Sequence, residues 1–265
     1  MDKHHVLAAF DEQMRRDARP DGPGALVERV GDVVRQVDAE GGWNGVVWSD
    51  LDRQTATPAI TEQVRHFTAL GREFEWKLYA HDQPVDLGGR LLAAGFLPEP
   101  EEALMVAPVR DLATDVRLPE GISLRLVTDT AGVDLVADVH EQAFGTGPSR
   151  IRRRLLAQLA GGPDRVVAVV AMAGDLPVCA ARMELHQGTE FASLWGGGTV
   201  PAWRGRGIYR SLIAFRAGIA DERGYHYLQV DASDQSRPIL QRLGFVLLSS
   251  TTPYLYQLEP KRYSQ

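Results

Sequence analysis

The stretch Val200-Pro201-Ala202-Trp203-Arg204-Gly205-Arg206-Gly207-Ile208-Tyr209 carries the strongest structural signal in this chain. It follows a strand-like apolar run at 191–195 and opens a helical run, in which apolar side chains recur on one face through residue 219. Glycines let a backbone approach an anion closely, and the free N–H groups and dipole of a helix start favour negative charge. Arginines at 204, 206 and 210 add positive charge. The stretch therefore predicts a phosphate-binding turn between a strand and a helix.

Residues 204–209 fit the pattern R-x-x-G-x-(G/A) up to its last position, which is Tyr209. Neither the glycine spacing of dinucleotide-binding folds nor the Gly-Lys-Ser/Thr ending of the P-loop is present. The pattern resembles the acetyl-CoA loop of the GNAT superfamily of N-acetyltransferases, whose backbone N–H groups hold the CoA pyrophosphate. The alternative reading is a glycine-rich turn made basic for solubility.

The order of elements around this loop extends the resemblance over residues 119–258. Strands are expected at 122–127, 166–172, 176–185, 227–231 and 254–256, and helices at 133–144, 151–159 and 208–223. A short helix ends in Gly244-Phe245, as the helix after the fifth strand does in GNAT domains. The resemblance implies an α/β fold with a mixed, mostly antiparallel sheet flanked by helices.

A shift of 149 residues aligns the first half of the chain with the second. Gly95-Phe96 then meets Gly244-Phe245, and the strands expected at 74–79 and 103–106 meet 223–228 and 252–255. The repeat predicts two GNAT-like units in tandem, with domains at 1–112 and 119–265. Residues 51–60 lie opposite the loop but contain no glycine and one arginine, so the first domain is expected to be a degenerate unit without a cofactor site. Chance recurrence of a short pattern is the alternative.

The loop and the resemblance together assign the acetyl-CoA contacts. Gly196-Gly197-Gly198 is expected to form a bulge whose free backbone groups pair with the pantetheine arm, and Ser233 stands where the family commonly has Asn. The expected cofactor-binding residues are Gly197, Gly198, Thr199, Val200, Arg204, Gly205, Arg206, Gly207, Ile208, Tyr209, Ser233 and Ser236.

Acyl transfer to a protonated amine needs a general base. The candidates are Asp231 and Glu184, with His186 and Glu190 behind them, although each is also explained as a surface charge at a strand end. Many family members protonate the leaving thiolate with a Tyr four residues before Gly-Phe, but this chain has Leu240 there. Tyr209 is the replacement candidate. The tyrosines at 254 and 256, and water, are weaker ones.

Composition narrows the class of protein. Apolar residues make up 44% and charged residues 24% of the 265 residues, as in soluble globular proteins, and no apolar run is long enough to span a membrane. The single cysteine, Cys179, lies in an apolar strand and excludes an intramolecular disulfide, which suits a cytoplasmic protein. No ligand spacing indicates a metal, and no basic helix or arginine tract indicates nucleic acid.

Charge is uneven along the chain. Residues 1–117 carry 13 basic and 21 acidic side chains (−8), whereas residues 118–265 carry 16 and 14 (+2). The basic half is the half with the loop, as an anionic cofactor would favour.

The sequence thus predicts an acetyl-CoA-dependent N-acetyltransferase that acts by direct transfer on an amine of a small molecule or peptide. A catalytically weak acyl-CoA sensor or scaffold is the alternative that Leu240 motivates. A purely structural interaction protein is a third, against which the intact loop argues. The acidic first domain is expected to serve as a packing partner, an acceptor lid or a homodimer surface.

Overall fold

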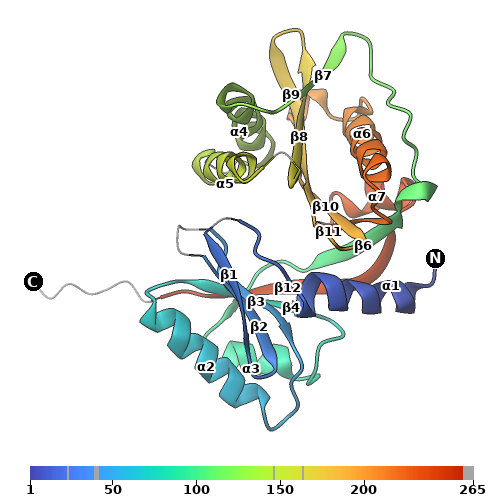
Figure 1. The fold of residues 1–265 in the computed structure, drawn as a ribbon. Coiled ribbons are helices and arrows are strands. Elements are labelled where there is room, and N and C mark those ends of the chain that lie inside the picture. The colour runs from blue at the N-terminus through green and yellow to red at the C-terminus, as the bar shows by residue number, and fades with distance from the viewer. Residues whose placement is uncertain (23, 39–41, 146, 163, 259–265) are drawn as a thin grey trace, which may run out of the picture. The chain divides into compact units, whose positions relative to one another are not determined.

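The computed structural model describes residues 1–22, 24–38, 42–145, 147–162 and 164–258, and it divides into two compact units. Within the described chain, the N-terminal unit contains Asp2–Leu104 together with residues 248–258. The C-terminal unit contains Met105–Leu247. Figure 1 shows the ribbon of both units.

The N-terminal unit is a sheet with the order β1-β2-β3-β4-β12, in which only β3 and β4 pair in parallel. Its core is aromatic: Phe67 stacks on Phe74, with ring centres 4.2 Å apart, and Phe96 meets Phe74 edge-on. Its elements are α1 (Lys3–Phe10), a π-helical turn (Asp11–Arg16), β1 (Ala25–Val30), β2 (Val33–Asp38), β3 (Gly45–Ser49), α2 (Ala56–Ala69), β4 (Phe74–Tyr79), α3 (Leu87–Ala93), β5 (Leu97–Pro98) and β12 (Val246–Tyr256).

The C-terminal unit is a sheet with the order β6-β11-β10-β9-β8-β7, in which β10 and β11 pair in parallel. Helices α4 and α5 pack on one face of this sheet and α6 on the other (Figure 1). Its elements are β6 (Glu102–Pro108), β7 (Ile122–Leu126), α4 (Thr130–Phe144), α5 (Ser149–Ala160), β8 (Val166–Ala173), β9 (Leu176–Leu185), β10 (Phe191–Thr199), α6 (Ile208–Glu222), β11 (Tyr227–Ala232) and α7 (Arg237–Arg242), with 3₁₀ turns at Val109–Asp111 and Pro201–Trp203.

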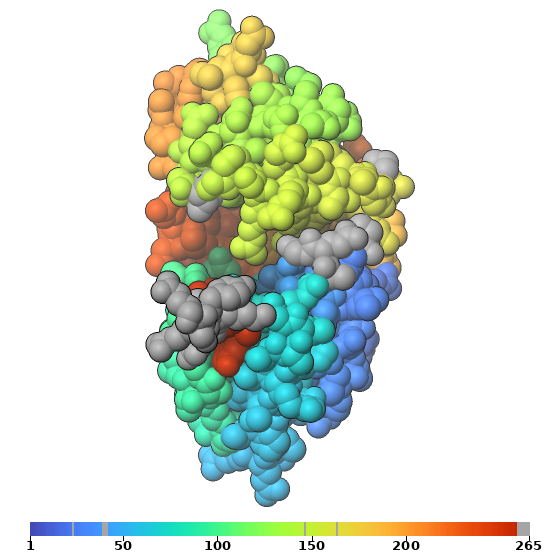
Figure 2. Space-filling model, turned by 90° about the vertical axis from the view of Figure 1, so that its left-hand side faces the viewer, coloured from blue at the N-terminus to red at the C-terminus, as the bar shows by residue number. Residues whose placement is uncertain are grey.

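Alternation along β9 explains how both faces of this sheet are filled. Ala180 belongs to the core under α4 and α5, whereas its neighbours Cys179 and Ala181 belong to the core under α6. Successive side chains of a strand point to opposite faces, so this part of β9, which is covered on both sides, is apolar at consecutive positions. In the space-filling view, α4 and α5, in green to yellow-green, spread over their side of the unit (Figure 2).

The glycine triplet forms the expected bulge in β10. The register with β9 shifts between Trp195 and Gly198, and Gly196 has a φ of +57°. The other two glycines are needed for space: a Cβ on Gly197 would lie 2.6 Å from Cε2 of Tyr209, and one on Gly198 would lie 2.7 Å from Cε2 of Phe144.

The mixed, mostly antiparallel α/β architecture predicted for two units is confirmed, but the last strand lies elsewhere than predicted. Residues 248–258 belong to the N-terminal unit, not to a domain at 119–265, because β12 pairs antiparallel with β4 from Thr251↔Tyr79 to Tyr256↔Phe74. The repeat-equivalent strand β6 is a neighbour of β11 instead. Strand β6, which ends the first repeat, thus lies in the sheet of the C-terminal unit, and β12, which ends the second repeat, lies in the sheet of the N-terminal unit. Because the two strands are exchanged, each unit keeps the same number of strands.

Candidate functional site: the loop before helix α6

The loop before α6 leaves a row of backbone donors unused. Gly205 and Gly207 have φ values of +75° and +82°, a region that favours glycine, and Gly207 caps α6 without any side-chain acceptor. Within the described part of the chain, no amide from Gly205 to Arg210 donates a hydrogen bond, and the first amide of the helix to do so is that of Ser211. Together with the helix dipole, these free N–H groups form a helix start that can accept an anion.

The arginines of the loop have different functions. Arg204 donates from Nε to the carbonyl of Thr199 and from Nη2 to that of Ala143, both at 3.1 Å, so it fastens the loop to β10 and α4. Arg206 lies over the Trp203 ring, 4.5 Å from its centre. Arg204 therefore holds the loop in place, whereas Arg206, which also donates to the Ala202 carbonyl, and Arg210 line the hollow beside the loop.

A basic hollow of about 500 Å³ opens beside the loop. It is lined by Gly205, Arg206, Gly207, Arg210, Ile239, Arg242 and Leu243. Arg242, at the end of α7, was not among the residues expected from the sequence. Its only sequence signal is a basic residue in the last turn of a helix, which is too common to indicate a ligand.

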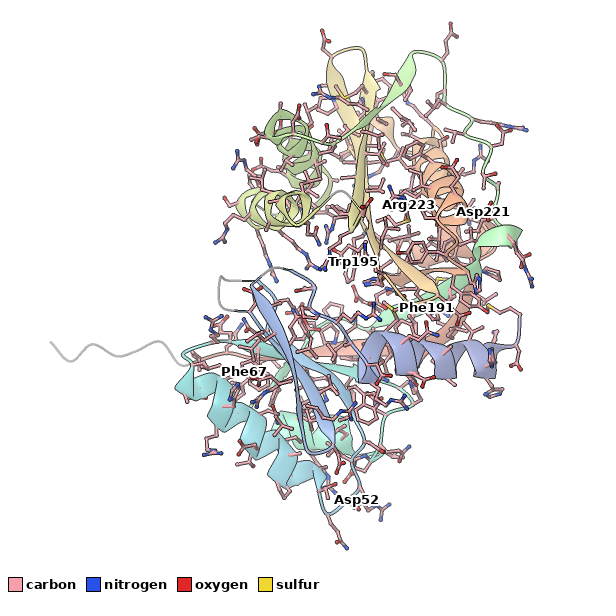
Figure 3. The ribbon with its side chains drawn as sticks, in the orientation of Figure 1. Asp52, Phe67, Phe191, Trp195, Asp221 and Arg223 are labelled. Atoms are coloured by element: carbon pink, nitrogen blue, oxygen red, sulfur yellow. The ribbon has the colours of Figure 1, made fainter. Side chains whose placement is uncertain are left out.

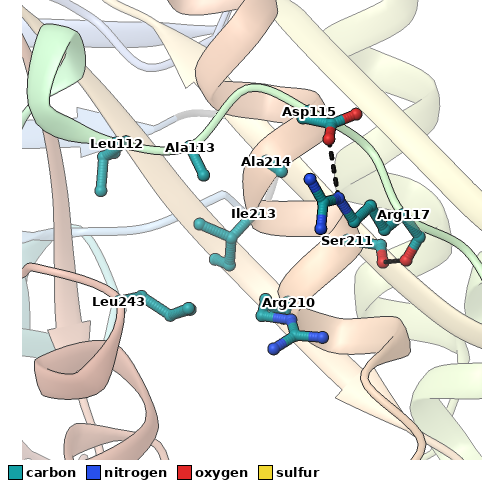
Figure 4. A pocket seen from close by; sticks show the side chains of 9 residues that line it. All are labelled: Leu112, Ala113, Asp115, Arg117, Arg210, Ser211, Ile213, Ala214 and Leu243. Carbon is teal, nitrogen blue, oxygen red and sulfur yellow. Dashed lines mark hydrogen bonds and ion pairs between the residues drawn. The ribbon is translucent and has the colours of Figure 1, made fainter.

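A second hollow, of about 250 Å³, lies between α6 and the segment that precedes β7 (Figure 4). There the Arg117 side chain forms an ion pair with Asp115 at 2.7 Å, and the Arg117 carbonyl oxygen accepts a hydrogen bond from the Ser211 hydroxyl. Arg210 and Leu243 line both hollows, which are therefore adjacent on the surface of the C-terminal unit.

The loop fits an organic pyrophosphate on the evidence of its own glycines. A Cβ on Gly205 would meet nothing within 4 Å, so the backbone is open on the side that a side chain would cover. One on Gly207 would lie 3.4 Å from Nη2 of Arg210, which places that guanidinium at the helix start. Backbone donors and three arginines thus surround one open space.

Tyr209 lies at the bulge of β10. Its hydroxyl is 3.5 Å from the position that a Cβ on Gly197 would take, and it makes no hydrogen bond within the described residues. Burial raises the pKa of the phenol, against the opposing charge of Arg216, so Tyr209 is protonated and has a proton to donate. Leu240, which stands in the family's tyrosine position, is fully buried in the core.

The strands β10 and β11 part beside this bulge. Their pairing covers only Phe191↔Tyr227 through Ser193↔Gln229, and no further pair joins them in the described chain. Gln229 donates to the Ser193 hydroxyl, so both side chains lie on the face that α4 and α5 cover. By alternation, Asp231 lies on that same face, beyond the point of separation.

Glu184 is brought to the same face but is tied into ion pairs. Its Oε1 accepts from Arg154 Nη2 at 3.2 Å, Arg182 Nε at 3.3 Å and Gln158 Nε2 at 2.7 Å. Burial alone would raise the pKa of this carboxyl, but the two guanidinium groups outweigh burial and lower it to about 2. Such a carboxylate is a poor proton acceptor near neutral pH, which favours Asp231 over Glu184 as the base.

The two other base candidates also have partners. Nε2 of His186 lies 2.7 Å from the Ser193 hydroxyl, and burial lowers the pKa of this imidazole, so it is neutral. Glu190 pairs with His226 at 2.7 Å.

Of the twelve expected cofactor residues, only Gly205, Arg206 and Gly207 line a hollow, and four of the others already bond within the protein. The Thr199 hydroxyl is 3.1 Å from the Cys179 sulfur, and the Val200 amide already donates to the carbonyl of Val178, so that N–H is not available to a ligand. Ser233 and Ser236 bond to each other, the Ser236 hydroxyl donating to the Ser233 carbonyl at 3.2 Å.

In the N-terminal unit, the turn before α2 corresponds to the loop before α6, and a carboxylate of that turn bonds to its free amides. Oδ1 of Asp52 accepts from the amides of Gln54 and Thr55, both at 2.8 Å, just before α2 (Figure 3). These backbone and hydroxyl donors lower the pKa of Asp52, so the carboxylate is charged. At the start of α2, the Asp52 carboxylate therefore already accepts from the free amides. At the start of α6, the corresponding amides have no acceptor within the described residues.

The described residues contain no group of three or more His, Cys, Asp or Glu side chains placed to hold a metal ion. None of their helices is both long enough and apolar enough to cross a membrane.

The fold is shared with several solved structures. A GCN5-related N-acetyltransferase from Kribbella flavida matches with a TM-score of 0.72 at 16% identity, over 97% of this chain and 96% of that one. A tandem GNAT protein from the clavulanic acid biosynthesis pathway matches with a TM-score of 0.63 at 13% identity, over 98% and 97%. A GCN5-related N-acetyltransferase from Sphaerobacter thermophilus matches with a TM-score of 0.61 at 14% identity, over 97% and 86%.

No protein-family profile matches the sequence, and no curated protein matches it either. At such low identities the likeness is one of fold, and it extends over nearly the full length of these proteins. The chain therefore has the tandem GNAT fold.

Proposed function

We propose that the chain is an acetyl-CoA-dependent N-acetyltransferase with one cofactor site, in its C-terminal unit. The observation that carries the proposal is the uncapped start of α6, where two glycines at positive φ leave the amides of residues 205–210 without acceptors beside a basic hollow. Acetyl-CoA would supply an activated acyl group. The fold likeness to proteins described as N-acetyltransferases supports the same conclusion.

In direct acyl transfer, different residues of the site would bind the cofactor, orient the acyl group and transfer protons. The amides of the loop, with Arg206, Arg210 and Arg242, would hold the diphosphate and neutralise its charge. The backbone of the bulge at 196–198 would orient the acyl carbonyl. Asp231 would take a proton from the ammonium form of the acceptor, and Tyr209 would donate one to the leaving thiolate. The remaining rate gain would come from alignment of the two bound substrates.

A second candidate function rests on one observation. Leu240 is fully buried where the family commonly has a proton-donating tyrosine, which suits a protein that binds acyl-CoA as a sensor or scaffold and turns it over weakly. Tyr209 at the bulge favours the enzyme. Steady-state CoA release with a panel of small amines and peptides separates the two functions, because a sensor binds acetyl-CoA without amine-dependent release.

The binding site is tested by a charge placed in the loop. Gly207→Asp adds a carboxylate where the diphosphate would lie, and acetyl-CoA affinity measured by calorimetry should fall below detection. Gly224→Asp is the matched control, since this glycine follows the other end of α6 at nearly the same φ of +77° and should leave affinity within about twofold. Equal affinity in both variants would exclude this loop as the site.

A further inference from the structure

Arg182 has hydrogen-bonding capacity that the protein does not use. This β9 side chain is 8% exposed, and its only hydrogen bond within the described chain runs from Nε to Oε1 of Glu184, at 3.3 Å. A guanidinium has five N–H donors, so both terminal nitrogens remain without an acceptor there. These two nitrogens are not among the fully buried atoms that lack a partner, so solvent, and therefore a ligand, can reach them.

The unused nitrogens lie against the bulge of β10. Nη1 is 3.2 Å from the position that a Cβ on Gly196 would take, and the guanidinium carbon is 5.7 Å from the centre of the Trp195 ring. Trp195 is the residue that pairs with Arg182 across the two strands, so both side chains stand on one face of the sheet. The guanidinium is thus within reach of the place where acyl transfer is proposed.

Asp231 stands on the same face, on the other side of β10. The strand order β11-β10-β9 puts Trp195 between Asp231 and Arg182. Neighbouring strands are about 4.8 Å apart, so the two backbones are separated by at least roughly 9 Å. A molecule lying across Trp195 would present one end to a carboxylate and the other to a guanidinium.

We infer that the acceptor is an amine that also carries a carboxylate, an amino acid or a peptide, and that Arg182 binds this carboxylate. The inference rests on the proposed function and adds to it the chemical class of the acceptor. A planar guanidinium matches a carboxylate in a two-point contact.

The neighbouring charges favour a carboxylate over a phosphate group. Glu184 lies against the Nε edge of Arg182 and would repel a second, doubly charged anion. His186 on β9 is held neutral by burial, and His140 on α4 is kept neutral by burial and by the charge of Arg182, so neither adds the positive charge that a phosphate needs. Arg154 on α5 lies over the same indole, 5.7 Å from its centre, and already pairs with Glu184.

The test compares each amine with its own amide. Amino acids and short peptides are assayed beside the matching C-terminal amides, with acetyl-CoA as donor and CoA release as readout. The wild-type protein should use the acids at least about tenfold better in kcat/KM, since a charge-assisted pair to the substrate is lost in the amide. This comparison uses only the wild-type protein, so a variant that fails to fold cannot affect it.

Substitutions assign the preference to Arg182. Arg182→Gln should lower kcat/KM for the acids by about tenfold to a hundredfold, mostly through a higher KM, and should change kcat/KM for the amides little. Arg182→Lys should keep part of the preference for acids over amides. Arg152→Gln is the control, because Arg152 is an exposed arginine on α5 that pairs with Asp134 at 2.6 Å. Acetyl-CoA affinity, measured by calorimetry, should be the same in all of these variants and reports that the fold is kept.

Three results would overturn the inference. Equal use of acids and amides by the wild-type protein would do so while leaving the acetyltransferase function intact. A preference for succinyl-CoA over acetyl-CoA that Arg182→Gln abolishes would place the carboxylate on the acyl donor instead. Acetyl-CoA binding without CoA release for any amine would remove the proposed function and this inference together.

Discussion

The proton donor expected at position 240 is absent from this chain, and Tyr209 is the proposed replacement. Leu240 fills the core where a proton donor is common, and Tyr209 occupies the loop position where the family often has a small residue. Its ring lies over Gly197, so the glycine and the tyrosine form one fitted pair. The sequence raised Tyr209 as a donor only by its proximity to the loop, and the structure adds the contact with the bulge.

Tyr209→Phe removes the proposed proton donor and little else. The backbone N–H remains, so acetyl-CoA affinity should change by less than about twofold, whereas turnover should fall about tenfold to a hundredfold at a pH where chemistry limits the rate. Tyr225→Phe, outside the site, is the control and should keep full activity. Unchanged turnover in Tyr209→Phe would leave the ring a packing function and strengthen the sensor hypothesis.

Glu184 makes stability depend on pH in a defined window. Its pKa falls from an ordinary 4.5 to about 2 in the folded state, so it stabilises the fold above about pH 4.5 and this stabilisation is lost as pH falls toward 2. The loss should be on the order of 3 kcal/mol in the free energy of unfolding. Glu184→Gln should be less stable at pH 6 and lack this decline. Asp134→Asn, which breaks an exposed pair, should retain it.

At the scale of elements, the strand–loop–helix unit from β10 to α6 was predictable and its surroundings were not. The glycine triplet predicted a bulge, and the loop pattern predicted a helix start, because both are local in sequence. The contacts of Gly198 with Ala143 and Phe144, and of Arg204 with the Ala143 carbonyl, join segments about 55–60 residues apart. No local pattern predicts such contacts, and the ion pair of Arg154 with Glu184, which joins residues 30 apart, was missed for the same reason.

Gly198→Ala tests whether the end of α4 fixes the bulge. The new Cβ would lie 2.7 Å from Cε2 of Phe144 and 2.9 Å from Cβ of Ala143, so helix or strand must move. We expect a loss of about 1–3 kcal/mol in unfolding free energy and a lower kcat. Gly89→Ala in α3, where a Cβ meets nothing within 4 Å, should be neutral or slightly stabilising. Full activity and stability in Gly198→Ala would show that α4 does not constrain the bulge.

At the scale of the whole molecule, the repeat was visible in the sequence but the exchange of its last strands was not. The 149-residue shift placed residues 103–106 opposite 252–255, which means that either strand fits either slot by its pattern. Side-chain size separates them: Tyr256 packs against Phe74 and Phe96, with ring centres 5.6 and 5.2 Å away, and the shift puts Ala107 opposite it. A short strand read alone does not reveal which of two similar sheets it joins.

The N-terminal unit should therefore depend on the far end of the chain for its stability. A fragment of residues 1–112 has only β6 to place beside β4, and with Ala107 in the position of Tyr256 it would leave a cavity against Phe74. The same fragment extended by residues 246–258 through a flexible linker should unfold at a clearly higher urea midpoint. In the full chain, Tyr256→Ala should cost about 2–4 kcal/mol, and Leu26→Ala, at a side chain that is 64% exposed, should cost little. Equal midpoints for the two fragments would show that β6 fills the slot as well as β12, and the exchange would then contribute nothing to the stability of the unit.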